Sequence, residues 1–130
     1  MRILFTGLGS IGKRHARLLR EHPQEFDLLA YRSGDVIKEN FDEFEEYTNL
    51  NEALASRPDI AFITNPTHKH LDTAIQCAQH DCHLFIEKPL SHTLDRVDKL
   101  VNEVNKRNLI TQMGCQLRFD PVLRKTRELI

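Results

Sequence analysis

The sequence has 130 residues, of which 40% are hydrophobic and 28% charged, and its formal net charge is −1 at pH 7. This length corresponds to one domain, large enough for a sheet covered by helices on both faces. The near-neutral charge gives no reason to expect nucleic acid or a membrane surface as a partner, and no apolar run is long enough to span a membrane. Because the N-terminus also lacks the basic region and cleavage site of a signal peptide, we expect a cytoplasmic protein.

The first dozen residues run from a short apolar segment, Ile3–Phe5, into three glycines spaced G-x-G-x-x-G. In a dinucleotide-binding unit Gly7 would permit a tight turn, Gly9 would let the main chain approach a pyrophosphate, and Gly12 would let a helix pack against the strand. The unpaired N–H groups at the start of that helix would face the phosphates. The alternative is a loop that needs glycine only for its backbone conformation. The helical spacing that follows favours the first reading, with one face made by Ile11, His15, Leu18, Leu19 and His22.

A second strand, Phe26–Tyr31, is followed by Arg32 and Ser33. In NAD-binding units an acid about twenty positions beyond the glycines binds the ribose 2′-hydroxyl, whereas an arginine nearby accommodates the 2′-phosphate of NADP. Here Tyr31 and Arg32 stand at that place and no acid is present. We therefore expect NADP to be preferred over NAD. The alternative is that Arg32 only ends an exposed strand in water.

Further along, two continuous apolar runs predict buried parallel strands, Ile60–Thr64 near the centre of the sheet and His83–Ile86. Between and around them we expect short elements with recognisable signals. These are a strand near Tyr47, a helix capped at Asn49, a helix with Leu71, Ala74, Ile75 and Ala78 on one stripe, a helix capped by Thr93 with Leu94, Val97, Val101 and Val104 in register, a strand over Leu109–Met113, and a last helix from Asp120-Pro121.

The run His83–Ile86 ends at Glu87, Lys88 and Pro89. Adjacent opposite charges at the end of a buried strand are hard to explain by packing, because burying either one without a partner costs free energy. The pair is therefore a candidate for chemistry. The alternative is an exposed strand end whose charges face water.

We expect no metal site. His68 and His70 lie two apart in a turn and lack the spacing of helical ligands. The cysteines Cys77, Cys82 and Cys115 have no CxxC spacing, so we expect reduced and partly buried thiols. One short acidic stretch lacks the pattern of a calcium loop, and we interpret it as a solvated face. It consists of Asp42, Glu43, Glu45 and Glu46.

Taken together, these motifs resemble the Gfo/Idh/MocA oxidoreductases over nearly the whole chain. The resemblance rests on the glycine fingerprint with Lys13-Arg14-His15 behind it, on Asn65-Pro66-Thr67-His68-Lys69-His70, on Glu87-Lys88-Pro89, and on Gly114-Cys115-Gln116-Leu117-Arg118-Phe119. It implies an α/β fold, a doubly wound and mostly parallel Rossmann sheet with helices on both faces. Residues 1–119 would be the NAD(P)-binding domain. Residues 120–130 would be a helix leading towards a second domain, for substrate and oligomerisation, that is absent from this chain.

The resemblance also implies roles for individual residues. Lys88 would be catalytic, and Glu87 would contact the ribose on the nicotinamide side. Gln116 stands where many relatives have asparagine, and Arg118 follows the family pattern. The full cofactor-binding set implied is Gly7, Gly9, Ser10, Ile11, Gly12, Tyr31, Arg32, Ser33, Thr64, Asn65, Pro66, Thr67, His70, Glu87, Lys88, Gln116 and Arg118.

The activity implied is hydride transfer between the nicotinamide of NADP or NAD and a hydroxyl-bearing carbon of a sugar, sugar derivative or polyol. The Lys88 ammonium would stabilise charge on the reacting oxygen. The partners implied are the dinucleotide, a small sugar-like substrate and, in a longer form, further copies of the chain in a homo-oligomer. Two alternatives stay open, a glycosidase or lyase relative without net redox turnover, and a dinucleotide-binding sensor module without chemistry.

Overall fold

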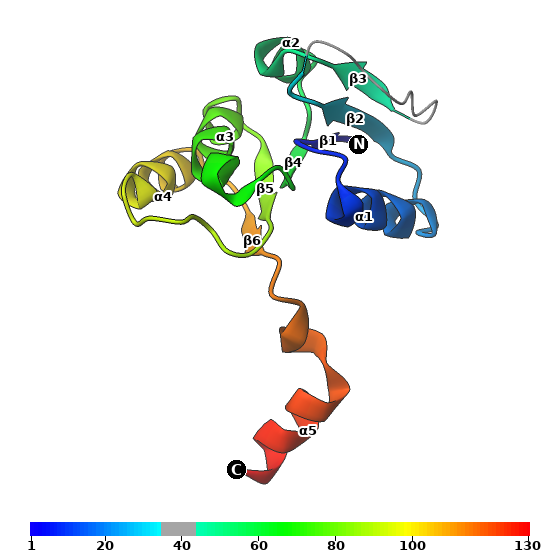
Figure 1. The fold of residues 1–130 in the computed structure, drawn as a ribbon, viewed down its shortest axis with the longest axis vertical. Coiled ribbons are helices and arrows are strands. Elements are labelled where there is room, and N and C mark those ends of the chain that lie inside the picture. Colours follow the sequence, from blue (N-terminus) through cyan, green and yellow to red (C-terminus); the bar gives the residue numbers. More distant parts are fainter. Residues whose placement is uncertain (35–43) are drawn as a thin grey trace.

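The computed structural model describes residues 1–34 and 44–130. Its centre is a six-stranded sheet in the order β3-β2-β1-β4-β5-β6, and every neighbouring pair is parallel (Figure 1). From the central pair β1 and β4, the chain adds β2 and β3 on one side and β5 and β6 on the other. The expected doubly wound sheet is therefore confirmed, and β4 is central. The strands are β1 (Arg2–Phe5), β2 (Asp27–Tyr31), β3 (Glu45–Tyr47), β4 (Ile60–Ile63), β5 (His83–Ile86) and β6 (Thr111–Met113).

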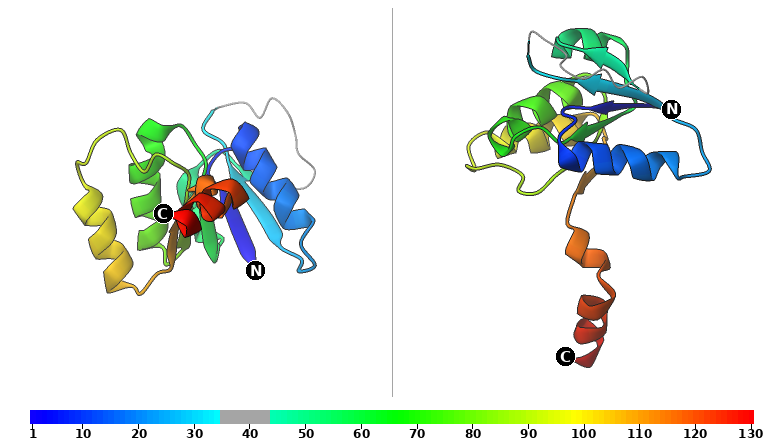
Figure 2. Two further views of the ribbon diagram at one scale, coloured as in Figure 1. Left: turned by 90° about the horizontal axis from the view of Figure 1, so that it is seen from below. Right: turned by 45° about the vertical axis from the view of Figure 1, so that its right-hand side comes forward.

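Helices cover both faces of the sheet (Figure 2). Side chains alternate along each strand, so Leu4 of β1 enters one core while Ile3 and Phe5 enter the other. The larger core lies under α2 (Leu50–Ala55), α3 (Thr67–Gln79) and α4 (Val97–Lys106), and the smaller one lies under α1 (Ser10–Arg20).

Helix α1 meets the sheet through small residues. Its fully buried residues are Gly12 and Ala16, which lie four apart, whereas Leu18 is 48% exposed. Small side chains face the sheet because the helix approaches it closely. Ile11, His15 and Leu18, which belong to the expected helical face, line a cavity.

Most local signals are confirmed. Asn49 Oδ1 accepts a hydrogen bond from the Asn51 N–H at 2.8 Å and caps α2. The exception is α4, which begins at Val97 after Arg96 in a left-handed conformation (φ 67°), so the Thr93 cap was wrong. The Thr93 N–H is bonded to Ser91 Oγ in the preceding loop. Leu94 lies before the helix and is 87% exposed, and Leu109 and Ile110 lie before β6.

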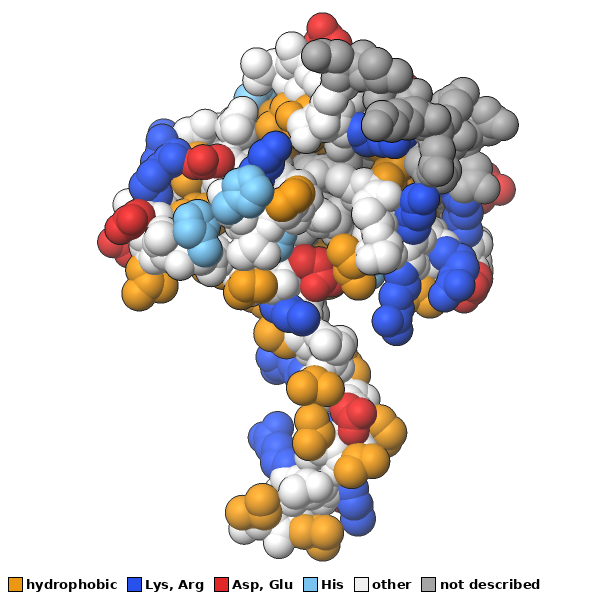
Figure 3. Space-filling view, in the orientation of Figure 1, with side chains coloured by type: hydrophobic (Ala, Val, Ile, Leu, Met, Phe, Trp, Pro, Cys, Tyr) orange, Lys and Arg blue, Asp and Glu red, His pale blue; other side chains and the backbone are white. Residues whose placement is uncertain are grey.

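The C-terminal segment projects away from the sheet (Figures 1 and 2). It consists of a short 3₁₀ helix, η1 (Gln116–Phe119), and α5 (Pro121–Leu129), which Asp120 caps through Oδ1 as expected. Figure 3 shows hydrophobic side chains along this segment. The exposed ones are Leu117, Phe119, Val122, Leu123, Leu129 and Ile130. Within the described ranges, no helix is long and apolar enough to cross a membrane.

Candidate functional site

The glycine turn connects β1 to α1 at the carboxyl edge of the sheet. A Cβ added to Gly12 would lie 2.2 Å from the Gly7 carbonyl oxygen, and one added to Gly7 would lie 3.1 Å from Asn65 Cα. A Cβ added to Gly9 would meet nothing within 4 Å. Gly7 and Gly12 are therefore required by packing, while Gly9 leaves an open approach to the main chain. Thr64 stabilises the turn, since its Oγ1 donates to the Gly7 oxygen at 2.8 Å.

The first turn of α1 has the features of an anion site. Gly9 is the N-cap residue and offers no side chain, so the N–H groups that follow it lack a side-chain acceptor. No acidic residue lies in this turn, and Lys13 and Arg14 follow it. Ser10, Ile11 and Gly12 thus present the positive end of the helix to the open space beside Gly9.

A cavity of about 580 Å³ lies beside this turn and runs along α1 to the ends of β4, β5 and β6. It brings together residues that are far apart in the sequence. Nine of them belong to the predicted set: Ile11, Thr64, Asn65, Pro66, Thr67, His70, Glu87, Lys88 and Gln116. Arg118 and the end of β2, with Tyr31, Arg32 and Ser33, are not among its lining residues.

The Glu87 carboxylate has two hydrogen-bond partners, and Gly114 leaves room for it. Its Oε1 lies 2.7 Å from His15 Nε2 of α1, and its Oε2 accepts from the Lys88 N–H at 3.2 Å. A Cβ at Gly114, after β6, would lie 3.0 Å from the same carboxylate. Glu87 is only 9% exposed, so the alternative of a charge facing water was wrong for this residue. Lys88 is exposed and lines the cavity.

Sequence reasoning did not predict the role of His15. Its ring packs against Phe85 and Phe62, with centroids 5.0 and 5.7 Å away, while its Nε2 reaches Glu87. A histidine three residues beyond Gly12 was visible in the sequence. Its pairing with Glu87, 72 residues later, was not visible there.

His70 connects two loops of the site. It is 2% exposed, and its ring nitrogens lie 2.7 Å from the Asn65 carbonyl oxygen and 2.9 Å from that of Pro89. Both nitrogens thus face main-chain acceptors, and the ring fixes the turn after β4 against the segment that follows Lys88. Neighbouring Asn65 donates from Nδ2 to Thr73 Oγ1, while its buried Oδ1 has no partner among the described residues. A buried acceptor of this kind fits a site built for a polar ligand.

At the end of β2, the structure brings charges from two other elements beside Arg32 and Ser33. Arg32 Nη1 lies 3.1 Å from Glu46 Oε2 of β3, and Lys69 Nζ of α3 lies 3.5 Å from Ser33 Oγ. The Glu46 side chain is 5% exposed, so its interpretation as part of a solvated face was wrong. Glu45 is exposed and pairs with Arg2, and Asp42 and Glu43 lie outside the described residues.

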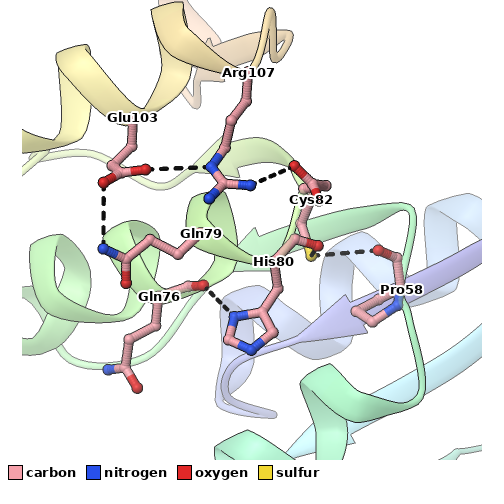
Figure 4. Close-up of polar contacts among 8 residues, drawn as sticks. Pro58, Gln76, Gln79, His80, Cys82, Glu103 and Arg107 are labelled. Atoms are coloured by element: carbon pink, nitrogen blue, oxygen red, sulfur yellow. Dashed lines mark hydrogen bonds and ion pairs between the residues drawn. The ribbon is translucent and has the colours of Figure 1, made fainter.

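A second cavity, of about 650 Å³, lies at the opposite, amino-terminal edge of the sheet between α2, α3 and the starts of β4 and β5. Two of its lining residues form hydrogen bonds with neighbouring groups (Figure 4). Gln79 donates to the Glu103 carboxylate, which also accepts from Arg107, and His80 bonds the Gln76 carbonyl oxygen. These hydrogen bonds, from Gln79 first, hold the pKa of Glu103 below its ordinary value. We regard this edge as structural, since ligands of open α/β sheets bind beyond the carboxyl ends of the strands.

In the described part of the chain, no group of three or more His, Cys, Asp or Glu side chains is arranged to hold a metal ion.

The three thiols are expected to differ sharply in reactivity. Cys77 and Cys82 are buried, and burial raises the pKa of Cys77 well above its ordinary value and that of Cys82 to about 12. Cys115 is exposed and lines the carboxyl-edge cavity. At about pH 8 a thiol reagent should label Cys115 alone in the folded chain, and all three cysteines after denaturation, because the thiolate is the reactive species.

The raised pKa values also affect stability. Below the ordinary thiol pKa both states keep the protons, whereas at higher pH the unfolded chain releases them first. The free energy of unfolding should therefore fall as the pH rises from about 9 to about 12.

The control for the labelling experiment is Cys115→Ser, which should not be labelled by the thiol reagent in the folded state. Fast labelling of Cys77 or Cys82 in the native protein would contradict their burial.

Comparison with known proteins gives consistent matches. The family model described as "Oxidoreductase family, NAD-binding Rossmann fold" matches residues 1–115. Myo-inositol 2-dehydrogenase of Thermotoga maritima is 33% identical over 138 residues, which cover 100% of this chain and 40% of that protein. The scyllo-inositol 2-dehydrogenase (NAD(+)) of Bacillus subtilis is 28% identical over 93% of this chain and 37% of its own length.

Among solved structures, myo-inositol 2-dehydrogenase from Lactobacillus plantarum superposes with a TM-score of 0.85 at 28% identity. The match covers 99% of this chain and 40% of that one. The chain thus spans about two fifths of the length of the proteins it resembles.

Proposed function

Since the chain belongs to the Gfo/Idh/MocA oxidoreductase family through its NAD-binding Rossmann domain, we propose that it is the cofactor-binding part of a dehydrogenase that oxidises a hydroxyl group of a sugar, sugar derivative or polyol. One observation carries this proposal. The glycine turn, the Glu87–His15 pair and the exposed Lys88 meet at the carboxyl edge of one parallel sheet, where ligands of such sheets bind. The names of the inositol dehydrogenases among the relatives support a polyol substrate.

In this proposal the chain binds the dinucleotide through its main chain. The N–H groups at Ser10, Ile11 and Gly12 hold the pyrophosphate beside Gly9. Asn65 Oδ1, which has no partner within the described part of the chain, accepts a hydrogen bond from the ligand. The bound dinucleotide supplies the hydride acceptor. Pro66, Thr67 and Gln116 line the same cleft.

The catalytic group in the proposal is Lys88. Its ammonium donates a hydrogen bond to the substrate hydroxyl oxygen and stabilises the charge that develops there as the hydroxyl proton leaves to a base. The Glu87 carboxylate, which accepts from the Lys88 N–H and is fixed by His15, holds the main chain at this position. His70 holds the following segment through the Pro89 oxygen.

The proposed coenzyme preference is for NADP over NAD. Arg32, Ser33 and Lys69 place two cations and a hydroxyl at the end of β2, where a 2′-phosphate of the adenosine ribose would lie. Tyr31 is the residue that stands in place of an acid, and it packs against the larger core.

The proposal includes a second domain. Residues 1–119 form the NAD(P)-binding domain, and residues 120–130 lead towards a domain that binds substrate and joins subunits into a homo-oligomer. The exposed apolar side chains of η1 and α5, Arg118 beside them, and the length of the relatives support this division. A cytoplasmic location belongs to the same proposal and rests on the family resemblance.

The test is to assay the 130 residues for binding and for turnover separately. We expect them to bind NADPH or NADH, seen by calorimetry and by protection of Cys115 from a thiol reagent, but to reduce no coenzyme with myo-inositol or sugars. A hydride step needs the substrate held close to the nicotinamide, and a misplacement of about 1 Å costs on the order of a hundredfold.

A longer polypeptide that includes a substrate domain should turn over. Substantial oxidation by the 130 residues alone would contradict the two-domain proposal. Binding without net reduction in any longer form would favour the glycosidase-type or sensor alternatives, and no binding at all would refute the proposed function.

A further inference from the structure

The end of β2 is flanked by an acid from the neighbouring strand. The parallel register pairs Ala30 with Glu46 and Tyr31 with Tyr47, and the Arg32 N–H continues the ladder to the Tyr47 oxygen at 2.9 Å. This pairing brings Glu46 beside the Arg32 guanidinium, with Nη1 at 3.1 Å from Oε2 and 3.5 Å from Oε1. An acid is therefore present beside Tyr31, Arg32 and Ser33, where the sequence itself shows none.

The burial of Glu46 makes this contact significant. Its side chain is 5% exposed and that of Arg32 is 24% exposed. A carboxylate removed from water requires a compensating charge, and the Arg32 guanidinium supplies it to Glu46 through Nη1. The contact is made through Nη1, one of the three nitrogens of the guanidinium fork.

A 2′-phosphate bound here would meet both charges of the pair. The guanidinium attracts it, whereas the Glu46 carboxylate repels it across a few ångströms of partly desolvated protein. The 2′-hydroxyl of NADH is neutral, so both the attraction by Arg32 and the repulsion by Glu46 would be weak for it. Lys69 adds a second cation next to Ser33.

We propose that Glu46 is a coenzyme-selectivity residue, which by pairing with Arg32 weakens the binding of a 2′-phosphate and keeps the preference for NADPH over NADH small. This inference rests on the proposed dinucleotide site. It adds that the selectivity of that site is set by β3 as well as by the end of β2. Neutralising Glu46 without changing its shape removes the negative charge that repels the phosphate.

The experiment measures dissociation constants for NADPH and NADH by calorimetry on the 130-residue chain and on Glu46→Gln. We expect Glu46→Gln to tighten NADPH binding by about tenfold and to change NADH binding by less than about twofold. Glu45→Gln is the matched control. It makes the same change in net charge one residue earlier on β3, at a side chain that is 59% exposed and paired with Arg2, and should leave both constants within about twofold.

Each outcome decides the question. If Glu46→Gln leaves the NADPH to NADH ratio unchanged, or weakens NADPH because Arg32 loses its support, the proposal is overturned. An equal rise in Glu45→Gln would assign the effect to net charge and overturn it as well. Should Glu46→Gln unfold, Glu46→Ala removes the same charge and is judged by the same ratio. Failure of the proposed function looks different, since the unmodified chain would then bind neither coenzyme.

Discussion

Replacing Gly9 by valine is expected to reduce dinucleotide affinity by about a hundredfold or more while the domain stays folded. The space next to Gly9 is open in the structure, and the valine side chain would fill the path of the pyrophosphate to the first turn of α1. Losing two charge-assisted hydrogen bonds of roughly 1.5–3 kcal/mol each accounts for this magnitude. Titration of Gly9→Val with NADPH and NADH measures the effect.

The fold should survive this change for a conformational reason. Gly9 has φ −68° and ψ −175°, which a valine adopts readily, so the free energy of unfolding should fall by no more than about 1 kcal/mol. Gly12→Ala is the contrasting control. Its Cβ would lie 2.2 Å from the Gly7 oxygen, so the main chain must shift and stability should fall by about 1–3 kcal/mol. Unchanged dinucleotide binding by Gly9→Val would mean that the phosphates lie elsewhere.

Replacing Lys88 by alanine should lower kcat on the order of 10²–10⁴-fold in a longer form of the protein that turns over a polyol. Lys88 is exposed and lines the cavity, and its neighbour Glu87 is held in place by His15. The loss of Lys88 would remove the group that we propose stabilises charge on the reacting oxygen. Steady-state kinetics with the polyol, alongside dinucleotide titration, separates this effect from binding, which should weaken by no more than about tenfold since a single contact is lost.

Lys99→Ala serves as the control for the lysine. Lys99 is exposed on α4, on the other side of the sheet from α1, and its removal changes the net charge by the same amount. It should leave kcat within about twofold. A Lys88→Ala variant with full activity would refute the catalytic role proposed for the lysine.

Elements with strong local signals were predictable from the sequence. The apolar runs of β4 and β5, the Asn49 cap of α2 and the Asp120-Pro121 start of α5 are set by side chains within a few residues of one another. The glycine turn belongs to this group, because its spacing encodes both a close helix approach at Gly12 and an open main chain at Gly9. The start of α4 escaped prediction, since Thr93 bonds within the preceding loop and the helix begins only where its apolar residues reach the core.

The sequence by itself determined the fold class, the carboxyl edge as the position of the candidate site, and half of the residues that line its cavity, because parallel strands carry their polar ends to a common edge. Only the tertiary structure decided how the polar and charged side chains are paired. His15 meets Glu87 across 72 positions, Glu46 meets Arg32 through strand pairing, and Lys69 meets Ser33 across the end of the sheet. The physical reason is that a hydrogen bond or an ion pair depends on distance in space and on removal from water, and a one-dimensional pattern of residue types specifies neither.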